Sequence, residues 1–431
     1  MKIAVNPAAE EWEALLRRPV LDLRKIEKIV LPIMEKVKRN GDKALIRFAS
    51  EYDHAQISEV LVSKEEMAAA ADKVDPLLKA SIEIAHKNIH AFHAAQQQEE
   101  LVMETMPGVI CRRRSVPIQR VGLYVPGGTA PLFSTVLMLG VPAKIAGCKE
   151  IVLCTPCNSK GEVNPVILYT AKLIGIERVV KAGGAQAIAA MSYGTESVPA
   201  VYKIFGPGNQ YVTAAKLVAA REGMAIDMPA GPSEVAVYAD ETAVPDFVAA
   251  DLLSQAEHGV DSQVILVASS QQVVDDVMAA QEKQLAKLPR KDIAERALEN
   301  STAIVMQKEK AAIALLNEYA AEHLILSVKD PHRIADRIVN AGSIFLGNFT
   351  PESAGDYASG TNHTLPTNGS ARAFSGVSLD SFVKKITLQE ITPAGMKKIG
   401  PAIEQMAEAE ELIAHKRAVS LRLNYIEDQD V

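Results

Sequence analysis

The 431-residue sequence has few cysteines and no long apolar run, and each deficit excludes a class of protein. Four cysteines are too few for a disulfide framework and fit a reducing compartment. The longest apolar stretch, residues 136–143, ends at Lys144, well short of the roughly 20 residues that a membrane span needs. Glu10, Glu11 and Glu13 stand where a signal peptide would need an unbroken apolar core. These deficits predict a soluble, cytoplasmic protein.

The chain also lacks a strong charge of either sign. Lys and Arg number 46 against 53 Asp and Glu, which gives a net charge of −7. Without long Lys/Arg clusters, such a chain is a poor binder of nucleic acid or membrane surfaces. Apolar residues make up 48% and charged residues 23%, an ordinary globular balance that argues against disorder. The composition therefore favours a folded protein that acts on a small, partly cationic molecule.

Hydrophobic periodicity divides the chain into four segments. Residues 1–105 have apolar residues at three-and-four spacing and predict a helical region, which we expect to pack on the second α/β unit. Residues 106–232 and 233–380 each alternate β-branched runs with helical patterns, which is typical of a parallel sheet covered by helices. Residues 381–431 predict a helical tail, preceded by a Gly/Ser/Thr-rich functional loop at 350–376. The predicted fold class is α/β, with two tandem three-layer units between helical ends.

Glycine-rich turns follow three predicted strands of the first α/β unit. They read YVPGGTAPL at 124–132, AGGAQA at 182–187 and GPGNQY at 206–211. A G-x-G-x-x-G fingerprint is absent, and the last of these turns lacks its third glycine. A glycine-rich turn between a strand and a helix can hold phosphate at the helix N-terminus. Together the three turns predict a dinucleotide crevice, although any one alone is a weak signal.

Two clusters look like metal or redox sites but are better explained by packing. His86, His90 and His93 share one helical face, yet the helix is Ala- and Gln-rich and no carboxylate or cysteine joins that face. Cys154 and Cys157 form a C-x-x-C at a strand end, without a second pair at zinc-ribbon spacing. We interpret the histidines as surface or packing residues and the cysteines as inert.

Side chains suited to zinc occur in three further segments. Two share a face at the end of a predicted helix, two lie in the Gly-rich loop, and two lie in the helical tail. Neutral imidazoles with carboxylate and amide oxygens suit a borderline cation such as zinc. Spacing alone leaves both a metal site and a purely structural role open. These residues are Gln255, His258, Asp356, His363, Glu410 and His415.

Glu322 and His323 form an acid–base candidate, although a bare dipeptide is a weak signal. The pair ends a predicted helix just before a strand. Histidine titrates near neutral pH and is the usual general base, and an adjacent glutamate could activate water or orient the ring. A helix-end histidine satisfied by carbonyl groups is the alternative.

The motifs taken together resemble those of the histidinol dehydrogenase family. Residues 226–234 (IDMPAGPSE) and 251–258 (DLLSQAEH) are similar to the family signature. The resemblance continues through VGLYVPGG, GGAQAIAA, FGPGN, AEHL, ESAGDYASGTNHTLPT and HKRAVSLR, and covers residues 20 to 425 approximately. Such a long, ordered set of motifs is highly specific.

The resemblance implies an enzyme of histidine biosynthesis that oxidises L-histidinol to L-histidinal and then to L-histidine. The expected cofactors are two NAD and one Zn²⁺ per subunit. Members of the family are homodimers whose C-terminal tails cross over to the partner. Their nucleotide units are incomplete Rossmann-like folds, which agrees with the missing third glycine.

The resemblance also implies a role for individual residues. The residues that match the zinc ligands are Gln255, His258, Asp356 and His415, and those that match the catalytic pair are Glu322 and His323. The residues that match further substrate contacts are Ser233, His363 and Glu410, and the zinc ligands and His323 also face the substrate. The residues that match NAD contacts are Tyr124, Gln186 and Asn209.

Two rival functions stay open. A related dehydrogenase could oxidise another small polar alcohol, such as a sulfonated diol, but His363 and Glu410 suit an imidazole and an ammonium group better. A zinc hydrolase could use Glu322 or Glu257 as its base. The absence of H-E-x-x-H and the presence of three glycine-rich turns argue against the hydrolase.

Overall fold

The computed structural model describes residues 1–19, 23–127, 131–228 and 231–429, which form two units. The first unit holds residues 1–96 and 118–382, and the second holds 97–117 and 383–431. Within the described residues, each helix is too short or too polar to cross a membrane. Gly128 of the first glycine-rich turn, and Pro229 and Ala230 of the family signature, lie outside the described residues.

A five-stranded parallel sheet forms one half of the first unit, in the order β6-β5-β4-β7-β8. Its strands are β4 (Arg120–Tyr124), β5 (Glu150–Thr155), β6 (Arg178–Lys181), β7 (Lys203–Phe205) and β8 (Ala225–Ile226). Apolar cores fill both faces, one with α6 (Phe133–Ala146) and α7 (Pro165–Leu173) and the other with α8 (Gly184–Tyr193) and α9 (Gln210–Arg221). Helix α6 is apolar all round because it is buried on all sides, which accounts for the long apolar run in the sequence.

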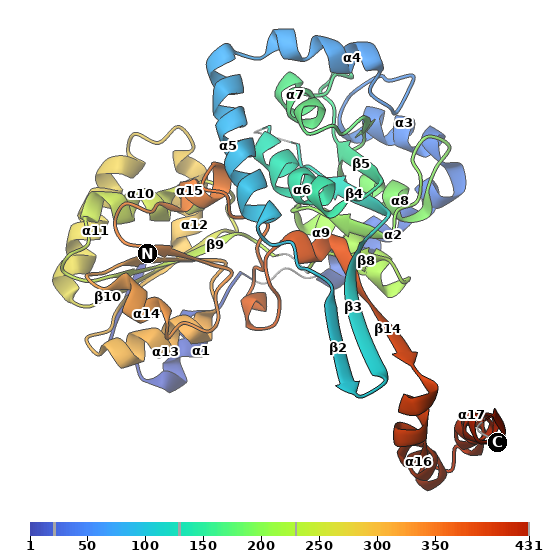
Figure 1. Cartoon of the computed structure of the whole chain (residues 1–431). Helices are drawn as coiled ribbons and strands as arrows, with labels where there is room; N and C mark the ends of the chain where they lie inside the picture. The colour runs from blue at the N-terminus through green and yellow to red at the C-terminus, as the bar shows by residue number, and fades with distance from the viewer. Residues whose placement is uncertain (20–22, 128–130, 229–230, 430–431) are drawn as a thin grey trace. The chain divides into compact units, whose positions relative to one another are not determined.

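A six-stranded parallel sheet forms the other half of this unit, in the order β1-β11-β10-β9-β12-β13. Figure 1 labels two of its strands, β9 and β10. Its strands are β1 (Lys2–Val5), β9 (Glu234–Ala239), β10 (Gln263–Ala268), β11 (Thr302–Val305), β12 (His323–Ser327) and β13 (Ser343–Leu346). The helices are α10 (Pro245–Ala256), α11 (Gln271–Leu285) and α12 (Lys291–Glu299) on one face, and α1 (Trp12–Leu15), α13 (Glu309–Tyr319) and α14 (Pro331–Ala335) on the other. All six residues of β9 and of β10 are buried, as expected for strands covered on both faces. The predicted pair of three-layer α/β units is confirmed.

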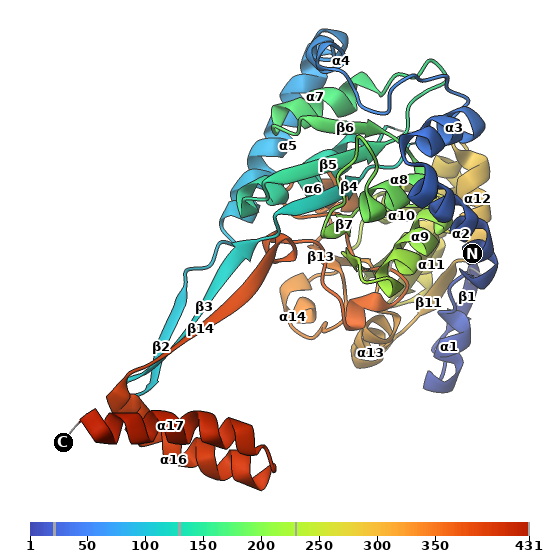
Figure 2. The same cartoon turned by 90° about the vertical axis from the view of Figure 1, so that its right-hand side faces the viewer.

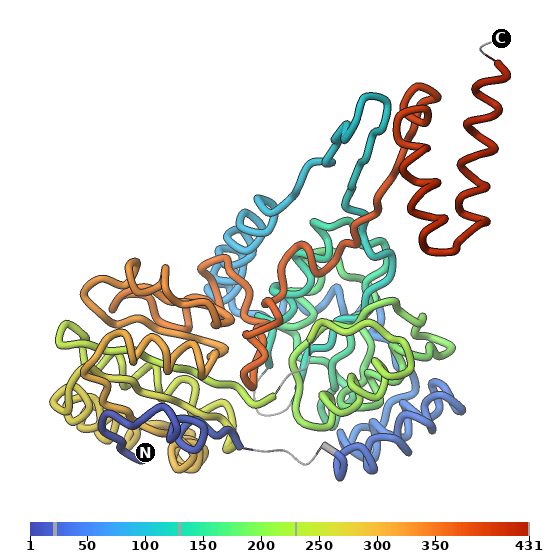
Figure 3. The backbone as a smooth tube through the Cα atoms, turned by 90° about the horizontal axis from the view of Figure 1, so that it is seen from below, coloured from blue at the N-terminus to red at the C-terminus, as the bar shows by residue number. Residues whose placement is uncertain are grey.

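The N-terminal helices pack on the five-stranded half, which corrects the expected packing of residues 1–105. They are α2 (Leu23–Asn40), α3 (Asp42–Tyr52), α4 (Lys64–Ala69) and α5 (Pro76–Ala94). Helix α2 contacts α8 and α9 through Val30, Met34 and Val37, and α5 contacts α6. Only the first residues join the other half, where β1 adds an edge strand beside β11. Figure 3 shows this N-terminal segment, in dark blue, running along that half. A helical stripe shows which face is buried but not which sheet it meets.

The second unit is an antiparallel sheet followed by a helical hairpin (Figure 2). Strands β2 (Leu101–Met106), β3 (Val109–Pro117) and β14 (Val383–Ile391) pair in the order β14-β3-β2, and α16 (Pro393–Ala409) and α17 (Ile413–Gln429) follow. Residues 101–105 and 383–391 are therefore strands, where the sequence predicts helix. The turn between β2 and β3 contains Gly108 at a φ of +85°, which favours glycine.

A buried ion pair ties the N-terminus to the start of β9. The Arg18 guanidinium makes two hydrogen bonds to the Glu234 carboxylate and donates to the Tyr319 carbonyl oxygen at 2.6 Å. The guanidinium also lies 4.2 Å from the centre of the Tyr319 ring. Only 2% of the Glu234 side chain is exposed, so its charge depends on Arg18.

Replacing Arg18 with Met should lower the free energy of unfolding by about 3–5 kcal/mol, because it leaves the Glu234 carboxylate buried without a cation. Urea unfolding at neutral pH measures this loss. Arg17 is an exposed neighbour, and its replacement with Met should change stability by less than about 0.5 kcal/mol. A loss below about 1 kcal/mol for Arg18→Met would contradict the dependence of Glu234 on this cation.

Candidate active site and nucleotide cavity

The catalytic candidates lie where two neighbouring strands of the six-stranded sheet begin. Strand β12 starts at His323, which pairs with Val235 of β9. The Glu234 N–H donates to Oε2 of Glu322 at 3.0 Å, and the Glu234 carbonyl oxygen lies 3.4 Å from Nδ1 of His323. Because α13 already ends at Tyr319, the pair stands at the start of a strand and not at the end of a helix. The sheet backbone thus fixes both side chains.

Three carboxylates surround the His323 ring. Nδ1 lies 3.6 Å from Oε1 of Glu352 and 3.8 Å from Oε2 of Glu322, while Nε2 lies 3.7 Å from Oδ1 of Asp356. Helix α15 (Glu352–Tyr357) supplies two of the acids from one face, four residues apart. Nε2 of His323 and Oε2 of Glu352 are buried and have no hydrogen-bond partner within the described part of the chain.

Burial and mutual charge determine the protonation of this cluster. Burial raises the pKa of Glu322 to about 8. Burial alone would lower the pKa of His323, but the carboxylates of Glu352, Glu322 and Asp356 raise it to about 10. Burial also raises the pKa of Asp251, which faces Glu352, to about 7. The cluster carries more acids than bases, and such an excess attracts a cation.

Gln255 and His258 approach the same cluster from the end of α10. The Gln255 side chain is fully buried. With its amide turned so that the NH₂ group donates to the Glu352 carboxylate, its oxygen lies 2.9 Å from the Glu234 nitrogen and shares that N–H with Glu322. Burial lowers the pKa of His258, and the negative charge of Asp356 opposes that shift. The structure therefore brings together three of the predicted zinc ligands, from the last turn of α10, the turn that follows it, and α15.

The remaining predicted residues divide between the two units. His363 lies between Asp356, whose carbonyl oxygen is 3.0 Å from Nδ1, and Thr135 of α6, whose Oγ1 is 3.3 Å from Nε2. Ser233 directly precedes β9. Glu410 ends α16 and His415 lies in the first turn of α17, so both belong to the second unit, where both are exposed. Their part in the site stays a prediction.

Glu352 is the site residue that the sequence reasoning missed. Its side chain is 1% exposed and contacts both His323 and Gln255. The available signal was its position four residues before Asp356, which places both carboxylates on one face if the loop begins with a helix. The Gly-rich composition of the loop hid that helix.

The donor atoms of this cluster fit a divalent cation. One ligand atom each from His323, Glu352 and Asp356 lies within 4.8 Å of the others. An imidazole nitrogen with carboxylate oxygens is a suitable donor set for zinc, and the buried Oε2 atom of Glu352 has no partner among the described residues. This set shares Asp356 with the four ligands that the resemblance implies.

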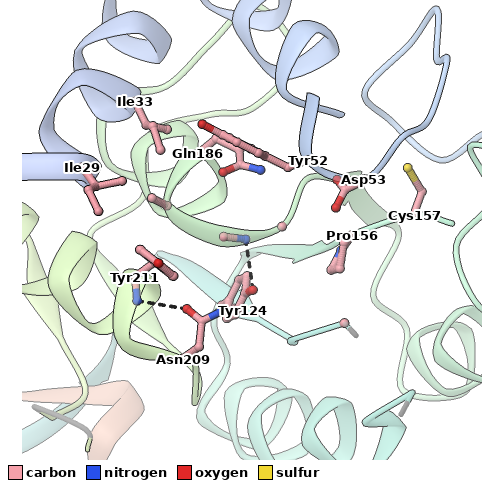
Figure 4. Close-up of a pocket in the computed structure, with 14 residues that line it drawn as sticks. Ile29, Ile33, Tyr52, Asp53, Tyr124, Pro156, Cys157, Gln186, Asn209 and Tyr211 are labelled. Atoms are coloured by element: carbon pink, nitrogen blue, oxygen red, sulfur yellow. Dashed lines mark hydrogen bonds between the residues drawn. The ribbon is translucent and has the colours of Figure 1, made fainter. Parts of the chain in front are cut away.

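A separate cavity of about 610 Å³ lies beside the carboxyl ends of the five-stranded sheet (Figure 4). The three predicted NAD contacts, Tyr124, Gln186 and Asn209, all line it. Oδ1 of Asn209 caps α9 by accepting from the Tyr211 N–H at 3.0 Å, so its NH₂ group remains for a ligand. The Tyr124 hydroxyl accepts from the Gly184 N–H at 3.1 Å, which leaves its own proton to donate.

Two of the predicted glycine-rich turns bring helix N-termini to this cavity. Helices α8 and α9 begin there, at Gly184 and Gln210. At Gly206 the φ is +135° and a Cβ would lie 2.2 Å from the Tyr124 carbonyl oxygen, so a side chain is excluded. Exposed N–H groups at helix N-termini are suited to phosphate groups.

The two packing interpretations agree with the structure. His93 is fully buried, with Nδ1 2.8 Å from the Ile89 carbonyl oxygen. All four cysteines are free, and burial raises the thiol pKa of Cys154 and Cys157, which makes both less reactive.

Comparison with known proteins places the whole chain in one family. A family model described as histidinol dehydrogenase matches residues 16–423. The chain is 57% identical over 424 residues to the histidinol dehydrogenase of Bacteroides thetaiotaomicron, covering 98% of this chain and 99% of the relative. It is 51% identical over 417 residues to that of Vibrio parahaemolyticus, covering 96% of each. The crystal structure of histidinol dehydrogenase from Elizabethkingia anophelis superposes with a TM-score of 0.97 at 55% identity, over 99% of both chains.

Proposed function

The chain belongs to the histidinol dehydrogenase family, and on that premise we propose that it oxidises L-histidinol through L-histidinal to L-histidine with two NAD and one zinc ion per subunit. It is an oxidoreductase of histidine biosynthesis. The observation that carries the proposal is the buried Glu322–His323 pair inside a cluster of metal-binding side chains. An acid–base pair beside metal donors is what two successive oxidations of one carbon require.

Zinc would be held by Gln255, His258 and Asp356, together with the His415 that the crossed tail of a partner subunit would supply. When bound, zinc supplies a positive centre that can hold the imidazole nitrogen and the amine of histidinol and orient the carbinol. The buried, unpartnered Oε2 of Glu352 supports a cation at this place. NAD, when bound, supplies the hydride acceptor, and the cavity lined by Tyr124 supports its place.

The two catalytic residues divide the proton transfers. His323, in its neutral form, removes the hydroxyl proton as the alcohol is oxidised, and its ring is oriented by the Glu234 carbonyl oxygen and the Glu352 carboxylate at Nδ1. The surrounding carboxylates raise the pKa of His323, and a zinc ion bound among them would offset their charge and so favour the neutral ring. Glu322 takes the proton from the water that adds to the aldehyde. The raised pKa of Glu322 suits a base that works near neutral pH. His363 and Glu410 hold the imidazole and ammonium groups of the substrate.

The second unit supports the proposal of a homodimer with crossed tails. It exposes many large apolar side chains, which mark a surface that a partner covers. They include Leu101, Val102, Met103, Met406, Leu412, Ile413, Leu421 and Tyr425. In such a dimer Glu410 and His415 would complete the partner's site.

L-Histidinol should drive NADH formation by the purified protein, and removal of metal with a chelator should abolish this activity until zinc is returned. Absorbance of NADH and metal content by mass spectrometry give both readouts. His258→Ala and Asp356→Ala should lose stoichiometric zinc and lower activity more than about 100-fold, because each removes a ligand. The double variant of His86→Ala and His90→Ala is the matched control and should keep its zinc. Zinc retained in either single variant would contradict the ligand assignment, and inactivity of the zinc-loaded protein toward L-histidinol would contradict the function.

A further inference from the structure

The half of the first unit that contains the five-stranded sheet lacks an acid at a position where nucleotide-binding folds usually carry one. In Rossmann-like folds an Asp or Glu after the second strand binds a ribose hydroxyl of the adenosine half of NAD. Here the second strand is β5, which pairs with the first strand, β4. The residues at its carboxyl end are Thr155, Pro156 and Cys157, and the last two line the cavity. The expected acceptor position therefore holds no carboxylate.

A carboxylate reaches the same part of the cavity from another element. Asp53 directly follows α3, in the N-terminal helical region, and lines the cavity together with Tyr52. Figure 4 shows Asp53 and Cys157 on one side of the cavity, with Asn209 and Tyr211 on the other. The charge of Asp53 contributes, after burial, to the raised pKa of both Cys157 and Tyr124, so it acts on the cavity wall.

The Asp53 carboxylate is only partly satisfied by the protein. Its Oδ2 atom is buried and has no hydrogen-bond partner among the residues that the structure describes. Burial raises the pKa of Asp53 to about 6, so the group is ionised above that pH despite its surroundings. An unpaired buried acceptor destabilises the fold. An unsatisfied buried acceptor therefore needs an explanation, and a donor that the protein itself does not supply is one.

We propose that Asp53 accepts hydrogen bonds from the adenosine ribose hydroxyls of NAD and thereby selects NAD over NADP. This inference rests on the proposed function, because it assigns the NAD site to this cavity. A carboxylate accepts from a ribose diol but repels the 2′-phosphate of NADP. Lys181, a cation close enough to act on Cys157, is held by Glu66 at 2.7 Å and so does not offset that repulsion.

Direct binding to the zinc-loaded protein tests the proposal without turnover. Isothermal titration calorimetry should show that the wild type binds NAD at least ten-fold more tightly than NADP. Asp53→Asn should weaken binding of NAD and of ADP-ribose about ten-fold or more, because a charge-assisted hydrogen bond is lost. The same variant should bind NADP no more weakly than the wild type, so the preference for NAD falls about ten-fold. Glu59→Gln, an exposed acid six residues later that does not line the cavity, is the matched control and should leave all three affinities unchanged.

Thermal unfolding separates this role from a structural one. The ligand-free Asp53→Asn protein should unfold at the same temperature as the wild type or higher, because an unpaired buried carboxylate is removed. If Asp53→Asn kept the same preference for NAD over NADP, the inference would be overturned. The proposed function would still stand in that case, provided that the wild-type protein binds NAD. The hypoxanthine analogue of NAD lacks the adenine amine. If Asp53→Asn lost affinity for NAD but not for this analogue, Asp53 would accept from the adenine amine and not from the ribose, and the inference would also be overturned. A wild type that binds neither NAD nor ADP-ribose would overturn both.

Discussion

Replacing His323 with Asn is expected to lower the oxidation of histidinol by about 10³-fold, within the usual range for loss of a general base. The ring is buried, and its Nδ1 edge is held by the Glu234 carbonyl oxygen and Glu352. Asn fits the space but does not titrate. Glu322 accepts from the Glu234 N–H through Oε2 and is assigned to the water of the second step, so it does not take over the role of the imidazole in the first.

Replacing Glu322 with Gln should instead separate the two half-reactions. The amide oxygen can still accept from the Glu234 N–H, so the geometry is kept while the base is lost. Oxidation of the alcohol should survive better than oxidation of the aldehyde, because only the second step needs water to be activated. NADH formation measured separately from histidinol and from histidinal, with zinc content verified, gives the two rates. Equal losses in both half-reactions would refute this division of labour and leave the family identity untouched.

Mixing two inactive variants should restore activity if the tails cross between subunits. His258→Ala removes a ligand in the first unit, and His415→Ala removes one in the second. A heterodimer of these variants has one site with both defects and one site with neither. Random pairing in equal amounts makes half of the dimers mixed, so about a quarter of the wild-type activity should return.

The control for this experiment is a mixture in which both defects come from the first unit, His258→Ala with Asp356→Ala. Every heterodimer then carries one defect in each site, and activity should stay at the level of the single variants. Restored activity in this control would point to reassortment or contamination. Verified heterodimers of the His258 and His415 variants that stay inactive would refute the crossover.

The elements of the fold that could be predicted from the sequence are those whose own residues show a clear hydrophobic pattern. Fully buried parallel strands read as short apolar runs, and β9 and β10 were identified in this way. Strand β1 has only four residues, too few to show a period. Strand β14 pairs with β3, more than 260 residues earlier in the chain, and its own residues are mostly exposed. Pairing between distant segments leaves little trace in either one, which is why these strands were missed.

Site residues that are neighbours in the sequence could be predicted. Site residues that come together only when separate helices and strands pack could not. Glu322 and His323 are neighbours in the chain, and the structure places them together at the start of β12. Glu352 and Asp53 were missed because their importance comes from what surrounds them after folding. Asp53 belongs to a helical region that the sequence assigned to the other half, so nothing local linked it to the cavity.

The three-stranded sheet of the second unit also sets an order of events during synthesis. Strands β2 and β3 leave the ribosome early and can form their hairpin, but β14 begins only at Val383. Until then one edge of β3 has no strand to pair with, and an open edge is a template for association with other chains. A nascent chain must protect that edge for most of its translation. Truncated products that end before Val383 would expose it permanently, so incomplete chains should aggregate more readily than the finished protein.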